Sequence, residues 1–229
     1  MAHTKRFGLS TVALTVALWS SALANNTLFS NDAIASQGLV SSLTLDSVAP
    51  GQNVNISVSG NPQATTAGQF NLTTSISNIT EAFCVDLQNF IFLNSPYINK
   101  YELYTARGRV GALLNLKASF FASASGATDL NDRAAAFQIA LWEIAYDHAA
   151  GNSDDLNAGI FQYNQNATIV NYANGLLSAT SGQSAPYFYL RGNYGDDPAQ
   201  DLVTLVPEPT SLMALAVGAV GLFVRRRRT

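Results

Sequence analysis

The chain has 229 residues, of which 48% are hydrophobic, and a formal net charge of −3 at pH 7. Half of its basic residues lie near the two ends, so that residues 25–206 carry six lysines and arginines against fourteen aspartates and glutamates, a net charge of −8. Such an acidic segment lacks the clustered cations that bind phosphates, which argues against nucleic acid and anionic lipid as partners.

The N-terminal segment has the pattern of a secretory signal peptide. Lys5 and Arg6 give a basic start, an apolar stretch covers residues 12–19, and Ala22-Leu23-Ala24 provides a small-x-small cleavage site. We therefore predict a signal peptide over residues 1–24, passage through the Sec translocon, and a folded domain over residues 25–206.

The first part of that domain predicts strands. Hydrophobic alternation marks residues 40–45, 53–58 and 69–74, and turn-forming residues at Pro50-Gly51 and Gly60-Asn61-Pro62 separate them. An antiparallel sheet or partial barrel with one packed face is expected.

The single cysteine, Cys84, lies in a further predicted strand, in which Phe83, Val85 and Leu87 alternate with Cys84 and Asp86. Exported proteins usually pair their cysteines, so one cysteine calls for an explanation. Three remain open: an intermolecular disulfide, an inert buried thiol, or a bond to a non-cysteine partner.

The second part of the domain predicts helices. A loop is expected to begin at Pro96, and apolar spacing predicts helices over residues 109–123 and 167–179. Residues 131–148 form the longest run of good helix formers, apolar on nearly every face, which predicts a central buried helix. Closing strands are predicted over residues 187–190 and 202–206.

One polar residue interrupts the apolar run of the central helix. Gln138 lies one turn before Trp142, so both side chains share a face and the amide is expected to face the core. A buried amide needs partners, because leaving it unpaired costs about 1 to 3 kcal/mol. Gln138 either hydrogen-bonds to a neighbouring backbone or has a more specific partner.

Two motifs together resemble the thioester-forming domains of bacterial surface proteins. In that family an aromatic-Cys-Val strand pairs with a Gln-x-Ala-x-Trp helix, and Phe83-Cys84-Val85 and the segment from Gln138 to Trp142 match both halves. The residue before the glutamine, which is often threonine in the Gram-positive adhesin members of that family, is Phe137. The resemblance implies a thioester between Cys84 and Gln138, and from their positions we expect Phe83, Phe137 and Trp142 to shield it from water.

Such a bond implies either covalent attachment to amine- or hydroxyl-bearing surface targets or a staple between sheet and helix. The alternative is a non-covalent structural or matrix-binding protein in which Cys84 is an inert thiol. A hydrolase dyad of Cys84 with His148 is disfavoured, because His148 lies ten residues beyond Gln138, about 15 Å along the helix. We expect no enzymatic activity and no cofactor. We also expect no metal site, since the acidic loop at residues 151–155 lacks the spaced ligands of a calcium loop.

The C-terminal segment resembles the PEP-CTERM sorting signal. Pro207-Glu208-Pro209 precedes an apolar stretch over residues 211–224, and four arginines follow: Arg225, Arg226, Arg227 and Arg228. Fourteen residues span about 21 Å as a helix, less than the roughly 30 Å hydrocarbon layer, which predicts a marginal membrane helix with the arginines on the cytoplasmic side. The resemblance implies recognition by an exosortase, a membrane enzyme of Gram-negative bacteria.

Taken together, these patterns predict an α+β domain in which an antiparallel sheet or partial barrel wraps around a small helical subdomain with a buried central helix. The sorting signal over residues 207–229 implies an exported precursor held transiently in the inner membrane. Its final location is then expected to be the cell surface or the extracellular matrix, with extracellular polysaccharide as a possible partner in a biofilm.

Overall fold

The computed structural model describes residues 35–192 and 199–206. The predicted signal peptide and sorting signal lie outside these residues. The strands are β1 (Ala35–Val58), β2 (Asn61–Thr74), β3 (Glu81–Cys84), β4 (Pro96–Gly108), β5 (Phe161–Gln162), β6 (Ala185–Arg191) and β7 (Leu202–Leu205). The helices are α2 (Arg109–Ala122), α3 (Ala127–Glu143) and α4 (Ala167–Thr180), and a π-helical turn, η1 (Ile144–His148), continues α3.

The strands pair in a closed ring. Hydrogen-bonded neighbours follow the order β2-β3-β7-β6-β4-β1, β1 pairs again with β2, and β5 adds to the far end of β1. Every pairing between these strands is antiparallel. β1 closes the ring because it is long enough to pair with β4 through its first half and with β2 through its second.

A pair of glycines lets β1 and β2 approach closely where β1 changes direction. Gly51 faces Gly68 across the ladder, next to a register shift between Val48 and Gly51. A Cβ atom added at Gly68 would lie 2.4 Å from the Pro50 carbonyl oxygen, closer than packed atoms approach. Glycine at positions 51 and 68 therefore lets the two strands bend together. The outer halves of β1 and β2, from Gly51 to Gly68, can then turn toward the helices.

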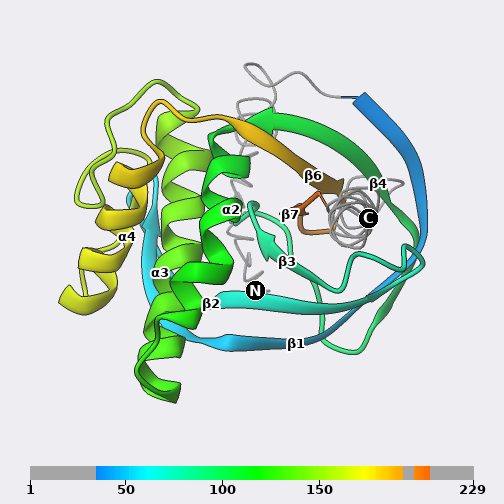
Figure 1. The fold of residues 1–229 in the computed structure, drawn as a ribbon, viewed down its shortest axis with the longest axis horizontal. Coiled ribbons are helices and arrows are strands. Elements are labelled where there is room, and N and C mark those ends of the chain that lie inside the picture. The colour runs from blue at the N-terminus through cyan, green and yellow to red at the C-terminus, as the bar shows by residue number, and fades with distance from the viewer. Residues whose placement is uncertain (1–34, 193–198, 207–229) are drawn as a thin grey trace, which may run out of the picture.

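The helices gather at one side of the ring, and the outer halves of β1 and β2 run along α3 (Figure 1). Every residue of α3 from Ala134 to Glu143 is buried, which confirms the predicted central helix. The mixed helix and strand content and the antiparallel sheet confirm the α+β prediction. Instead of wrapping around the helices as a partial barrel, the strands close a ring beside them.

The alternation predicted for the early strands is confirmed. Val54 and Ile56 are buried, whereas Asn53 and Asn55 are exposed. Two predictions nearby were wrong. Pro50-Gly51 is a bend inside the continuous strand β1, since the hydrogen-bonded pairing with β2 resumes directly at Gly51. Residues 96–108 form strand β4, with Tyr101 and Leu103 buried on its inner face, where a loop was expected.

Candidate functional site

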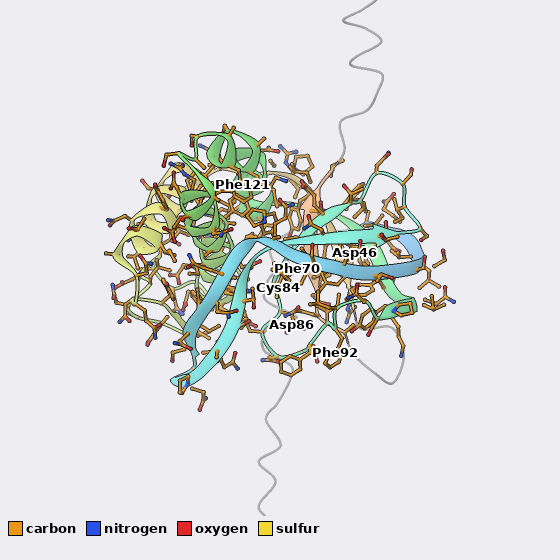
Figure 2. All side chains as sticks on the ribbon, turned by 90° about the horizontal axis from the view of Figure 1, so that it is seen from below. Asp46, Phe70, Cys84, Asp86, Phe92 and Phe121 are labelled. Atoms are coloured by element: carbon orange, nitrogen blue, oxygen red, sulfur yellow. The ribbon has the colours of Figure 1, made fainter. Side chains whose placement is uncertain are left out.

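Cys84 is the last residue of β3, where it faces Leu202 of β7 across the ladder. Its side chain is 1% exposed, because β3 lies between two strands of the ring and beside the end of α3. Figure 2 shows Cys84 inside the molecule, with Asp86 and Phe92 in the loop that follows β3. The cysteine therefore has no direct access to solvent.

Gln138 comes to this cysteine from α3 and is fully buried. Its carboxamide contacts the main chain of Cys84 twice: the Cys84 amide donates to Oε1 at 3.1 Å, and Nε2 donates to the Cys84 carbonyl oxygen at 2.6 Å. The structure thus brings the two predicted residues together. It also agrees with the simpler expectation for Gln138, because the buried amide is paired with a neighbouring backbone.

The thiol of Cys84 is neutral in this position. Its Sγ donates to the carbonyl oxygen of Asp86 at 2.9 Å. Burial, and then the negative charge of Asp86, raise the pKa of the thiol far above its ordinary value, because both disfavour a thiolate. The indole N–H of Trp142 acts in the opposite direction and lowers that pKa.

Aromatic rings close off one side of this region. The rings of Phe83 and Phe137 lie with their centroids 4.7 Å apart and their planes tilted by 43°, and Phe121 of α2 meets Phe137 edge-on at 5.7 Å. Phe83, Phe137 and Trp142 are each at most 1% exposed. Phe121 was not expected as part of this wall, although it follows the apolar spacing of α2.

A layer of polar groups that no sequence pattern predicted surrounds the cysteine on the other side. The Asp86 carbonyl oxygen accepts a second hydrogen bond from Gln200 Nε2 at 2.8 Å. Tyr146 of η1 accepts a hydrogen bond from the Leu87 amide at 2.8 Å. These contacts fix the chain on both sides of the cysteine.

Asp201, directly before β7, belongs to the same layer and is 2% exposed. It accepts hydrogen bonds from the Tyr189 hydroxyl and from the Gly192 amide, the latter at 2.7 Å. Burial raises the pKa of Asp201 to about 6. No period or motif singles this aspartate out in the sequence, because its role depends on a ring of strands that joins distant segments.

His148 lies away from the cysteine. Its side chain is half exposed at the end of η1, with Nδ1 3.7 Å from Asp154 Oδ1. Asp154 makes a stronger contact with Arg109 at the start of α2, which grips both carboxylate oxygens at 2.7 Å. The acidic loop thus joins α2 to the end of η1.

Two acidic residues near that loop are fully buried. Asp147 accepts hydrogen bonds from the Ile160 and Phe161 amides, both at 2.7 Å. Glu143 accepts one from the Asp155 amide through Oε1, whereas its Oε2 has no hydrogen-bond partner among the described residues. Burial, and then the charge of Asp147, raise the pKa of Glu143 to about 8. Within residues 35–192 and 199–206, no three histidine, cysteine or acidic side chains are arranged to hold a metal ion.

The sorting residues Pro207, Glu208 and Pro209 and the arginines 225–228 lie outside the described residues, as does the predicted membrane segment. The part of the chain that the structure describes contains no helix long and apolar enough to cross a membrane.

Comparison with known families supports the C-terminal prediction. Residues 205–228 match the family model described as the PEP-CTERM protein-sorting motif. Comparisons with curated proteins and with solved structures found no match. The motif indicates an exported protein that is sorted and processed by an exosortase and whose precursor passes through the membrane.

Proposed function

We propose that this exosortase-sorted protein forms an internal thioester between Cys84 and Gln138, which staples the strand ring to the central helix. The observation that supports this proposal most is that both main-chain groups of Cys84 hydrogen-bond to the Gln138 carboxamide inside the buried core. Once the sulfur is turned toward the carboxamide carbon, holding the two reacting groups together can supply roughly 7 to 11 kcal/mol of the reaction barrier.

The step balances without a further reagent. After a rotation about its Cα–Cβ bond, the Cys84 sulfur adds to the Gln138 side-chain carbonyl carbon. The carbon–nitrogen bond then breaks, the thiol proton leaves with the amide nitrogen, and ammonia is released. Because a thiolate is the better nucleophile and Cys84 is protonated, the proton must leave the sulfur as the carbon–sulfur bond forms, and it becomes the third hydrogen of the released ammonia.

Burial favours a staple over a reactive adhesin. Cys84 and Gln138 are at most 1% exposed, and aromatic rings cover one side, so an amine from another molecule cannot reach the bond without an opening of the fold. Closing the segment between these residues would stabilise the domain by about 4 kcal/mol if the bond acts as a disulfide does. The protein would then be a durable component of the cell surface or extracellular matrix of a Gram-negative bacterium.

A second candidate rests on the same contacts. The thiol already donates to Asp86, and the Gln138 amide is already paired with backbone groups, so neither group needs a bond to be satisfied. In that case Cys84 is an inert core residue and the protein is a non-covalent structural or matrix-binding surface protein.

Intact mass separates the two candidates. We expect the native protein to be lighter by one ammonia than its sequence, and Cys84→Ala and Gln138→Ala each to have the full mass of their own sequence. Full mass in the unchanged protein, with a thiol that reacts once the chain is unfolded, would favour the second candidate.

Methylamine then tests whether the bond is sealed. A staple gains the mass of methylamine only after denaturation, when the thioester becomes accessible. Rapid gain by the native protein would instead indicate an exposed thioester and covalent attachment to amine-bearing targets.

A further inference from the structure

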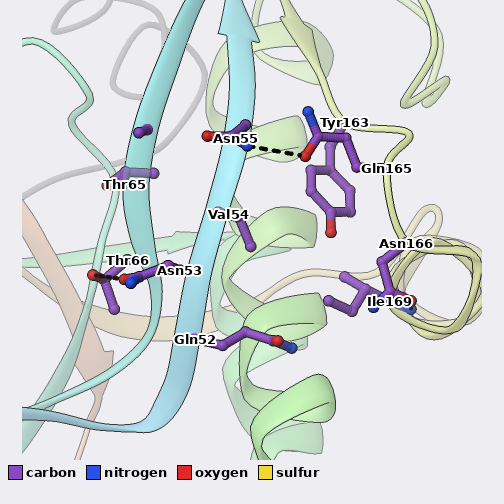
Figure 3. A pocket seen from close by; sticks show the side chains of 11 residues that line it. Gln52, Asn53, Val54, Asn55, Thr65, Thr66, Tyr163, Gln165, Asn166 and Ile169 are labelled. Carbon is purple, nitrogen blue, oxygen red and sulfur yellow. Dashed lines mark hydrogen bonds between the residues drawn. The ribbon is translucent and has the colours of Figure 1, made fainter.

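A pocket lies beside the outer halves of β1 and β2, and Cys84 is not among the residues that line it. The outer halves of β1 and β2 form one wall, and the segment from β5 into α4 forms the other (Figure 3). The pocket has a volume of about 540 Å³, within the range of roughly 300 to 1,000 Å³ typical of small-molecule sites.

The lining of this pocket carries no charged side chain. Its polar groups are carboxamides and threonine hydroxyls, and the carboxamides come from Gln52, Asn53, Asn55, Gln165 and Asn166. A carboxamide offers both donors and an acceptor, as a sugar hydroxyl does. The lining therefore suits a neutral ligand with many hydroxyl groups.

Some of these polar side chains hydrogen-bond to one another. Thr66 donates to Asn53 Oδ1 at 2.9 Å, and Asn55 Nδ2 donates to Gln165 Oε1 at 3.4 Å (Figure 3). These contacts orient the amides but leave Asn53 Nδ2, Asn55 Oδ1 and Gln165 Nε2 without partners among the described residues. Donors and acceptors thus remain side by side on the wall.

Tyr163 provides a second, independent indication of a ligand. Its side chain is 4% exposed, and its hydroxyl points into the pocket between Val54 and Ile169 (Figure 3). The hydroxyl has no hydrogen-bond partner among the described residues, so it can pair with a ligand hydroxyl in the pocket. Together with Val54 and Ile169 the ring gives an apolar surface for the CH face of a sugar, and the hydroxyl gives a polar end.

We propose that this pocket binds a neutral oligosaccharide segment. Sugar hydroxyls would pair with Asn53, Asn55 and Gln165, and one would pair with the Tyr163 hydroxyl. Acidic saccharides are disfavoured, because the domain is strongly acidic and Asp132 lies next to the pocket, hydrogen-bonded to Gln52 at 2.6 Å.

The test titrates the full exported protein with neutral hexasaccharides: maltohexaose, cellohexaose, laminarihexaose and the mannose hexamer. A uronic acid hexamer serves as the charged comparison. We expect calorimetric binding of at least one neutral hexamer and weaker or no binding of the uronic acid hexamer.

The variants locate the site. Tyr163→Phe and Asn55→Ala should each weaken binding about fivefold, the loss expected for one hydrogen bond of about 1 kcal/mol. Gln37→Ala, an exposed amide at the other end of β1, should bind as the unchanged protein does. Asn166 is unsuitable as a variant, because it caps α4 by accepting hydrogen bonds from Thr168 and Ile169.

The proposal is overturned if no neutral hexamer binds or if the uronic acid hexamer binds more tightly. It is also overturned if both pocket variants bind as well as Gln37→Ala. These outcomes do not depend on the thioester, which can be checked in the same samples by mass.

Discussion

Gln138 keeps two main-chain groups of Cys84 hydrogen-bonded inside the core, and this role can be measured without any thioester. In a Cys84→Ala background no such bond can form, yet the backbone contacts of Gln138 remain possible. Adding Gln138→Ala should lower the free energy of unfolding by about 2 to 5 kcal/mol, because two buried polar groups lose their partner.

Urea unfolding followed by circular dichroism gives that difference. Gln183→Ala is the matched control, since this exposed glutamine should change stability by less than about 0.5 kcal/mol. Equal stability of the single and double variants would mean that water or a rearranged strand replaces the carboxamide.

Glu143 should make stability fall with rising pH. Its pKa is about 8 in the folded protein against an ordinary 4.5, so between these values the folded form holds a proton that the unfolded chain releases. The stabilisation is therefore complete below about pH 4.5 and is lost as the pH rises through about 8. Glu143→Gln keeps the Oε1 acceptor for Asp155 and should remove this dependence.

The free energies of unfolding of the unchanged protein and of Glu143→Gln are best compared between pH 6.5 and 8.5. Asp201, with a pKa of about 6, also makes stability fall with rising pH, but it does so at lower pH. Between pH 6.5 and 8.5 the unchanged protein should lose about 2 kcal/mol of stability that Glu143→Gln retains. Glu102→Gln is the control, because hydrogen bonds from Ser36 and Tyr104 lower rather than raise the pKa of that partly exposed carboxyl. If stability falls with pH as steeply in Glu143→Gln as in the unchanged protein, Glu143 is not the group responsible.

At the scale of elements, the close approach of β1 and β2 at Gly51 and Gly68 constrains which residues the two strands can carry there. Gly68→Ala should destabilise the protein by about 1 to 3 kcal/mol, because its Cβ would meet the Pro50 carbonyl oxygen and the Gly51 Cα. Gly175→Ala lies in α4 with open space around it and should stabilise by about 0.5 to 1 kcal/mol, since alanine favours helix. The midpoint of thermal unfolding should therefore fall for Gly68→Ala and rise for Gly175→Ala, and an unchanged or higher midpoint for Gly68→Ala would contradict the close approach.

The helices could be predicted from sequence because apolar spacing alone defines them. Predicted bounds of 109–123 and 167–179 compare with Arg109–Ala122 and Ala167–Thr180 in the structure. β4 was missed because its start is rich in polar residues and a proline, and Asn99 adopts a positive φ of 50°. What makes this segment a strand is pairing with β1 and β6, which local sequence does not contain.

The candidate site was predictable to a similar degree. Cys84 and Gln138 stand out as the single cysteine and as the one amide in an apolar run, so their pairing could be expected from the motifs. Asp201 and the Tyr146 hydroxyl could not, because only the folded chain brings the segment before β7 and the turn η1 beside the residues that follow Cys84. The unpaired Oε2 of Glu143 likewise depends on tertiary packing.

For the whole molecule, the sorting signal governs where the domain ends up. Glu208→Ala, or loss of the exosortase, should leave the precursor in the inner membrane, because the motif that matches residues 205–228 is no longer processed. Fractionation followed by immunoblotting measures this, with Glu102→Gln as a control that leaves the tail intact. Release of Glu208→Ala at the normal level would contradict the role of the motif.

The position of β7 has a mechanical consequence. The sorting motif begins at the end of this strand, which is flanked by β3 on one side and β6 on the other. A tensile load on an anchored tail would enter the fold along β7 and be shared in shear by two ladders, one of which pairs Leu202 with Cys84. A covalent link from Cys84 to α3 would pass that load to the helices and so resist the extraction of β7 by flow or traction.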